Sequence, residues 1–260
     1  MMNYLRWTDL EMKRFYKVFL IMMGIVLVVE SVVLAFNIMQ MKPHLMMGEK
    51  FSLYSIAENN LLFYIPILFA IAALCFYVFF TWYREWFGKN TFAYQLLLLP
   101  FNRMAVYYAK LTSLLLYILG SLVFQIAIYP LLNGIYQWLM PEANKADTQL
   151  LIWLNNDWIL QTIIPLHYIE FFFFYGMGIM GVIAVTTMIL LERSYRLKGI
   201  GYAVLYTAGY VLVMLLPAMI NQFIPLYTNE LIFGLIMTAL IATVSSLALS
   251  HYLMNKKIWV

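Results

Sequence analysis

Residues 18–41 read VFLIMMGIVLVVESVVLAFNIMQM, an apolar run whose only charged side chain is Glu30. A helix of roughly 20 apolar residues crosses the hydrocarbon core of a bilayer, which is about 30 Å thick. The run does not alternate apolar with polar residues as a barrel strand does, and no small-residue cleavage pattern precedes Lys42. It therefore predicts an uncleaved membrane-spanning helix rather than a strand or a removed targeting peptide.

Five further apolar runs continue this pattern along the chain of 260 residues. The chain is 65% hydrophobic and 11% charged, whereas soluble domains are about 25% charged, so its polar side chains cannot cover a water-facing surface. The composition predicts an all-α integral membrane protein and excludes a soluble enzyme domain. We expect one six-helix transmembrane domain over residues 1–260, with spans at 18–41, 61–82, 106–132, 163–191, 199–219 and 231–254.

Lysine and arginine are distributed unevenly among the segments that separate these spans. One set of segments holds thirteen of the 16, and the other set holds only Lys42, Lys50 and Lys145. By the positive-inside rule, this split predicts that both termini are cytoplasmic. It also accounts for the net charge of +4 without a nucleic-acid partner. All seven tryptophans fall at or beyond the predicted span ends, where indole rings favour the headgroup region.

Three segments outside the spans have features of their own. Residues 1–17 place charged and apolar side chains on opposite helical sides, which predicts a helix lying in the cytoplasmic membrane interface. Residues 133–162 are the most polar stretch and are expected to form an extracellular loop. Residues 218–230 are apolar and lie beside prolines, which favours a short re-entrant or interfacial turn on the outer side.

Motifs for binding nucleotides or metals are missing from the sequence. No Gly-x-x-x-x-Gly-Lys-Ser/Thr loop occurs, so ATP would have to bind to another subunit. Gly176, Gly178 and Gly181 match Gly-x-Gly-x-x-Gly, but they lie within an apolar helix, where such spacing favours close helix packing. The three histidines are too far apart for a local metal motif. We expect no catalytic residue, metal or cofactor on this chain.

Ionisable residues inside the predicted spans form a second group of candidates. Glu30 lies in the middle of the first span, where a carboxylate must be protonated, paired or hydrated. It either contacts a translocation path or proton site, or holds helices together through Ser31, Asn37 or Gln125. His167 and Glu170 lie three residues apart near the outer end of the fourth span and could hold a cation or form a helix-end hydrogen bond. Glu30, His167 and Glu170 are the candidate substrate-path residues.

The segment between the second and third spans, residues 83–105, carries the most specific pattern. Charged residues open it, Asn90 or Thr91 can cap a short helix, and Pro100 ends that helix. The segment resembles the loop between the second and third spans in permease subunits of ABC-2 type exporters. That family has a glycine, a Leu-Leu-x-Leu-Pro run, an arginine and a later lysine. The matching residues are Gly88, Leu96, Leu97, Leu99, Pro100, Arg103 and Lys110, with Asn102 in place of the family's small residue.

The resemblance implies a multi-pass half-transporter of the bacterial cell membrane. It would pair with a second permease subunit, identical or related, and with two ATP-binding subunits that carry ATP and Mg. Residues 83–105 would form the coupling helix and residues 192–198 a second cytoplasmic contact. The resemblance also suggests export of amphipathic peptides, such as toxins and antimicrobial peptides, or of related antibiotics. The expected ATPase-coupling residues are Arg84, Glu85, Gly88, Lys89, Thr91, Pro100, Arg103, Glu192, Arg193 and Arg196.

Three alternatives stay open at this point. The charges near residues 83–105 could only anchor helices at the membrane surface. The chain could be an intramembrane protease or lipid-modifying enzyme that uses Glu30, His167 and Glu170, although such enzymes normally have paired acids and several histidines. It could also be a secondary transporter, for which repeats between the two halves are expected and no convincing match is found.

Overall fold

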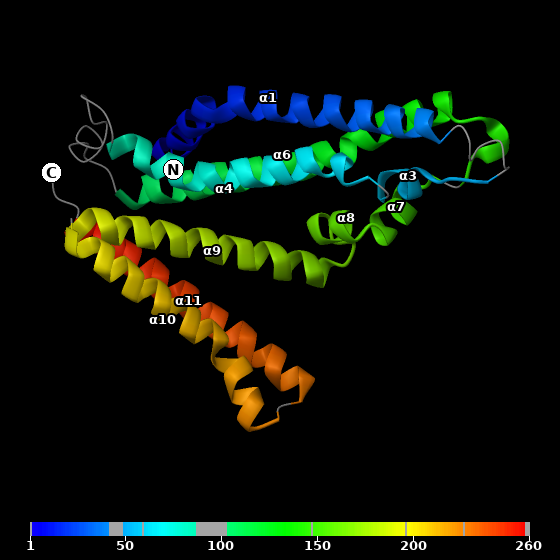
Figure 1. Cartoon of the computed structure of the whole chain (residues 1–260). Coiled ribbons are helices and arrows are strands. Elements are labelled where there is room, and N and C mark those ends of the chain that lie inside the picture. The colour runs from blue at the N-terminus through cyan, green and yellow to red at the C-terminus, as the bar shows by residue number, and fades with distance from the viewer. Residues whose placement is uncertain are drawn as a thin grey trace. The chain divides into compact units, whose positions relative to one another are not determined.

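A computed structural model describes residues 2–41, 49–58, 60–86, 103–146, 148–195, 197–225 and 227–257. Within these ranges the regular structure consists of helices, shown in Figure 1, and one isolated parallel bridge between Phe51 and Lys145. Six helices are long and apolar enough to cross a membrane. They are α1 (Met2–Gln40), α4 (Ile65–Trp86), α6 (Arg103–Leu139), α9 (Tyr168–Tyr195), α10 (Leu197–Phe223) and α11 (Thr228–Lys256). The prediction of six helices long and apolar enough to cross a membrane is confirmed.

Short helices occupy the connections between α1 and α4 and between α6 and α9. The first connection contains α3 (Leu53–Glu58) and the 3-10 turn η1 (Leu61–Phe63). The second contains η2 (Glu142–Asn144), α7 (Leu150–Asn156) and α8 (Trp158–Ile163). The segment predicted as an extracellular loop is therefore largely helical, and its location outside the cell stays a prediction.

The long helices extend past the ends of the predicted spans. α1 continues without a break across residue 17, so residues 2–17 and the first span are one helix rather than two. The orientation of residues 2–17 in a membrane interface, like the cytoplasmic location of the termini, stays a prediction. α10 includes Pro217 and ends only at Phe223, so the segment predicted as a turn begins as helix. A proline lacks one backbone donor, and neighbouring groups can compensate for that loss in a membrane helix.

The chain divides into two compact units. One unit comprises Met1–Trp7, Phe76–Leu111 and Phe173–Val260, and we call it the α9–α11 unit. The other comprises Thr8–Cys75 and Thr112–Phe172, and we call it the α7–α8 unit. Helices α1, α4, α6 and α9 each contribute residues to both.

The α7–α8 unit has a core of large apolar side chains around its short helices. Leu132 and Tyr136 of α6 pack there with Phe63, Trp153 and Leu160, and all five are almost completely buried. Asp157 caps α8, because its carboxylate accepts the backbone N–H groups of residues 159 and 160 at 3.0 Å each. The same carboxylate accepts the hydroxyl of Tyr64. Burial and the adjacent carboxylate raise the pKa of Tyr64, so this phenol stays protonated and donates.

The α9–α11 unit packs residues of five helices, α4, α6, α9, α10 and α11, into one aromatic and aliphatic cluster. Trp82 of α4 and Tyr107 of α6 contact Ile189 and Leu190 of α9 and Leu253 of α11. Figure 1 shows α10 and α11 running side by side as a hairpin. A short connection joins them, and the backbone N–H of Tyr227 donates to the Glu230 carboxylate at 3.0 Å as α11 begins.

Candidate functional site

Both ends of the segment that carries the family resemblance are tied to other helices in the α9–α11 unit. At the end of α4, the Tyr83 hydroxyl donates to the Glu192 carboxylate of α9. The guanidinium of Arg193 lies over the Tyr83 ring, 4.7 Å from its centroid. At the start of α6, Arg103 Nη1 donates to the backbone carbonyl of Met254 in α11 at 3.2 Å. We call Tyr83, Arg103, Glu192, Arg193 and Met254 the flank cluster.

A buried lysine supports the flank cluster from within the same unit. Lys110 of α6 is only 2% exposed, and its ammonium group donates to the Thr81 carbonyl of α4 at 2.8 Å. The ammonium also lies over the Trp82 ring, 5.1 Å from the centroid. Such a desolvated cation–π contact contributes about 2 kcal/mol. Lys110 therefore joins α4 to α6 about two turns from Arg103, on the same two helices that flank the segment.

The predicted coupling residues divide into three groups. Glu192 and Arg193 contact Tyr83, and Arg103 makes a separate bond to Met254. Arg84 lies over the Phe80 ring of its own helix at 5.6 Å. Glu85 belongs to α4, but its side chain lies outside the described part of the structure. The remaining predicted coupling residues also lie outside the described residues: Gly88, Lys89, Thr91, Pro100 and Arg196.

Two members of the flank cluster are not evident from the sequence. Tyr83 is an aromatic residue near the end of an apolar run, a position that membrane interfaces also favour, so its sequence gives no specific signal. Met254 contributes a backbone carbonyl, which any residue could provide. Glu192 and Tyr83 are 109 residues apart, so only the folded structure brings them together.

Hydroxyl groups link the helices deeper in the α9–α11 unit. The Thr187 hydroxyl of α9 lies 2.8 Å from that of Ser250, and the Tyr206 hydroxyl of α10 lies 2.5 Å from that of Ser246. The Tyr107 hydroxyl of α6 lies 3.3 Å from that of Thr186. Buried polar side chains are hydrogen-bonded in most proteins, and here these bonds connect four apolar helices.

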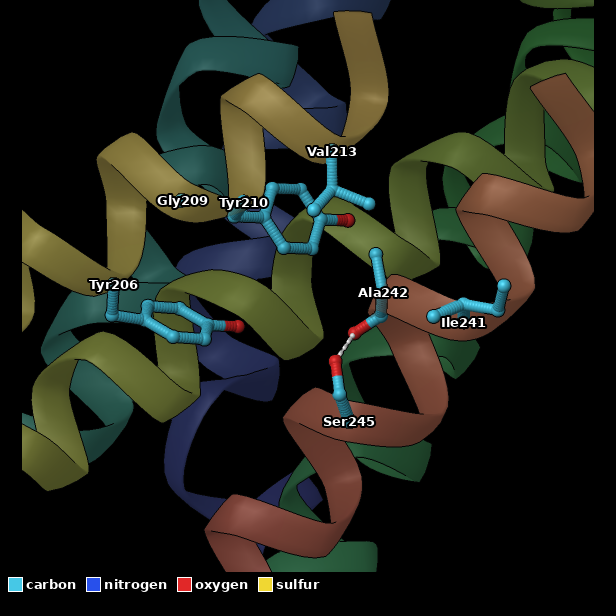
Figure 2. A pocket seen from close by; sticks show the side chains of 7 residues that line it. All are labelled: Tyr206, Gly209, Tyr210, Val213, Ile241, Ala242 and Ser245. Atoms are coloured by element: carbon cyan, nitrogen blue, oxygen red, sulfur yellow. Dashed lines mark hydrogen bonds between the residues drawn. The ribbon is translucent and has the colours of Figure 1, made fainter. Parts of the chain in front are cut away.

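A pocket of about 270 Å³ opens between α10 and α11 beside these hydroxyls. Figure 2 shows Tyr206 and Tyr210 on one wall and Ser245 on the other, with the Ser245 hydroxyl donating back to the Ala242 carbonyl. A methyl group added at Gly209 would meet no heavy atom within 4 Å apart from the adjoining backbone of its own helix. Gly209 therefore leaves open space in the pocket. The pocket combines an apolar lining with hydroxyl groups, as sites for amphipathic molecules do.

The predicted substrate-path residues are not gathered into one site. Glu30 is completely buried in the α7–α8 unit and accepts a hydrogen bond from the Gln125 side chain at 3.0 Å. Gln125 was one of three partners that the sequence suggested. His167 is exposed and Glu170 is partly exposed at the start of α9. No group of three or more His, Cys, Asp or Glu residues that could hold a metal occurs within the described ranges.

The glycine strip of α9 differs from the sequence-based prediction. Gly176, Gly178 and Gly181 were expected to let another helix pack closely. A methyl group added at any of them would meet no heavy atom within 4 Å among the described residues. All three positions of α9 are therefore open within the described chain, and no described helix packs closely against these glycines.

The fold defines the chain as a multi-pass helical membrane protein. Comparisons with protein-family models, curated proteins and solved structures give no match. The resemblance to ABC-2 permeases therefore depends on the residues of this sequence alone.

Proposed function

We propose that the chain is the membrane subunit of an ATP-driven ABC exporter, paired with a second permease subunit and two ATP-binding subunits. The observation that carries the proposal is the flank cluster. It fixes both ends of the segment resembling the coupling helix to α9 and α11. A push on that segment from a soluble partner is then transmitted to α9 and α11 through bonded contacts.

Two further features support this assignment. Gly178 and Gly181 lie on one side of α9 and are open within the described chain, and small residues let membrane helices from different subunits approach closely. The pocket between α10 and α11 offers an amphipathic molecule an apolar wall and several hydroxyls. Both features fit a permease that pairs with another permease and exports amphipathic peptides or antibiotics across a bacterial cell membrane.

The test measures coupling between the permease and its ATPase. The chain is purified with ATP-binding subunits encoded beside it, and ATP hydrolysis is measured in lipid vesicles with and without an amphipathic peptide. Arg103→Met and Glu192→Gln should still bind the ATPase, but peptide-stimulated hydrolysis should fall about tenfold or more. A hydrogen bond to a charged group contributes about 1.5–3 kcal/mol, and 1.4 kcal/mol corresponds to tenfold.

Lys13→Gln is the matched control, because Lys13 pairs with Asp9 while both side chains are exposed. That pair should contribute little, and coupling should not change. The proposal fails if no ATP-binding subunit associates with the chain, or if the flank-cluster variants couple as well as the control.

One observation favours a second function, that of a proton-coupled secondary transporter. Glu30 is a fully buried carboxyl group within a membrane-spanning helix, a feature typical of proton-coupled pumps and transporters. Transport in vesicles that persists without ATP and stops when the proton gradient is collapsed would support this function and contradict the exporter.

A further inference from the structure

The buried carboxyl group of Glu30 lies near the middle of a membrane-spanning helix. It is 12 residues from the start and 11 from the end of the apolar run 18–41, or about 18 and 17 Å along the helix axis. Its exposed fraction is 0%. The side chain therefore faces protein, not lipid or water.

The described surroundings of Glu30 supply no positive charge. Its one hydrogen bond among the described residues comes from Gln125 Nε2 of α6, which is a neutral donor. The charged residues of α1 other than Glu30 lie at positions 6–17, and the described charged residues of α6 are Arg103 and Lys110. Gln125 is 15 residues beyond Lys110, about 22 Å along the helix. Lys110 itself is bonded to Thr81 in the other unit.

The remaining charged residues of the α7–α8 unit also have other positions or partners. Glu58 bonds Tyr54, and Asp157 bonds Tyr64 and caps α8. Glu142 pairs with Lys145 at 2.5 Å. Glu49, Lys50 and Glu170 are at least partly exposed outside the core. None of these groups is recorded in contact with the Glu30 carboxyl group among the described residues.

An unpaired carboxylate in such a place costs several kcal/mol or more, and a buried acid normally binds a proton instead. The position of the proton follows from the hydrogen bonds. Oε1 already accepts from Gln125, whereas Oε2 is buried without a hydrogen-bond partner among the described residues. The hydroxyl of the adjacent Ser31 is likewise buried without a described partner.

We propose that Glu30 and Gln125 form an intramembrane proton-binding site, in which Glu30 is a neutral carboxylic acid with its proton on Oε2. The site holds its proton while α1 and α6 are packed together. Separation of the two helices admits water, and the acid then ionises to a carboxylate and a proton that passes to water. This proposal does not depend on the exporter assignment, because it concerns only the charge of one side chain.

Infrared spectroscopy tests the charge directly. The full chain is purified at pH 7 in a detergent without ester groups, and the carbonyl band of a protonated carboxylic acid is recorded. We expect this band in the wild type and its loss in Glu30→Gln, a neutral substitution of nearly the same shape. Carbon-13 labelling of glutamate should shift the band in the unmodified protein, which assigns it to a glutamate rather than an aspartate even if the variant misfolds.

The Gln125→Leu variant tests whether the Glu30 carboxyl group is hydrogen-bonded to Gln125 or is only buried beside it. Without its donor, the Glu30 carbonyl should absorb at a higher frequency, while the band is retained. Glu11→Gln is the matched control, because Glu11 is also buried, at 1% exposed, but pairs with Arg14 at 3.0 Å. Because its carboxyl group has this cationic partner, its replacement should leave the acid band unchanged.

A chemical probe provides an independent measurement. Dicyclohexylcarbodiimide adds a protonated carboxylic acid across its C=N bond, and membrane-buried acids are accessible to this apolar reagent. Labelling at Glu30 should occur at pH 7 and should be unaffected by Na⁺. Absence of the acid band in the wild type, or its persistence in Glu30→Gln, would overturn the proposal. Protection by Na⁺ at constant pH would also overturn it, because the site would then hold a cation.

Discussion

Gly199 lies where two backbones come too close for a side chain. It is the third residue of α10, and it is packed against the last turns of α9. A methyl group at this position would lie 2.6 Å from the Leu191 carbonyl oxygen and even closer to that of Glu192. Both obstacles are backbone atoms, so no side-chain rotation can relieve the clash. We predict that Gly199→Ala forces the ends of α9 and α10 apart.

The expected magnitude follows from this geometry. Overpacking of a tightly packed site costs about 1–3 kcal/mol, so Gly199→Ala should lower the free energy of unfolding by about that amount. Gly201→Ala, two residues along the same helix, meets no heavy atom within 4 Å. It should raise the free energy of unfolding by about 0.5–1 kcal/mol, because alanine favours a helix more than glycine does. The two alanines should therefore have opposite effects.

Unfolding in mixed micelles, followed by circular dichroism, measures both changes. Because Glu192 belongs to the flank cluster, Gly199→Ala should also weaken the contact between Glu192 and Tyr83. Peptide-stimulated ATP hydrolysis should then fall for Gly199→Ala and stay constant for Gly201→Ala. Equal stabilities of the two variants would refute the reasoning about close backbone approach.

Three further predictions concern other contacts. Asp157→Ala removes the cap of α8 and the acceptor of Tyr64, so it should cost about 2–4 kcal/mol of unfolding free energy, and Tyr64→Phe should cost less; equal costs would contradict the capping role. The hydrogen bond to Glu58, followed by burial, raises the pKa of Tyr54 to about 12, so Glu58→Gln should lower it toward the ordinary value of 10.0 in an NMR titration. Gly178→Leu should not lower monomer stability but should weaken pairing with a second permease, measured by cross-linking in vesicles; unchanged pairing would exclude Gly178 from the contact.

The sequence predicted the number of apolar helices well and their ends less well. Hydropathy detects only the apolar part of a helix, which lies in the hydrocarbon core. The helix itself ends where its backbone hydrogen bonds end. α6 thus runs to Leu139, seven residues past the predicted span, and α10 passes through Pro217. The short helices α7 and α8 contain polar residues, and composition alone gave no reason to expect them.

Of the residues in the candidate site, the sequence predicted only the charged ones. Arg103, Glu192 and Arg193 stand out in an apolar chain, and in the structure each contacts a residue of another helix. Their partners are a tyrosine and a backbone carbonyl, which have no distinctive pattern. For Glu30 the sequence left three partners open, since the rotation of α1 against its neighbours decides among Ser31, Asn37 and Gln125. Only packing could select Gln125.

The unbroken helix α1 has a mechanical consequence. Its 39 residues span about 58 Å, nearly twice the hydrocarbon thickness of about 30 Å. A single rod of this length must protrude from the bilayer or tilt strongly within it. Because α1 is one continuous helix, a rotation of its first turns about the helix axis would also rotate Glu30. A rotation of about 100°, the angle between successive residues, would move the Glu30 carboxyl group away from Gln125 and place its proton in a new environment.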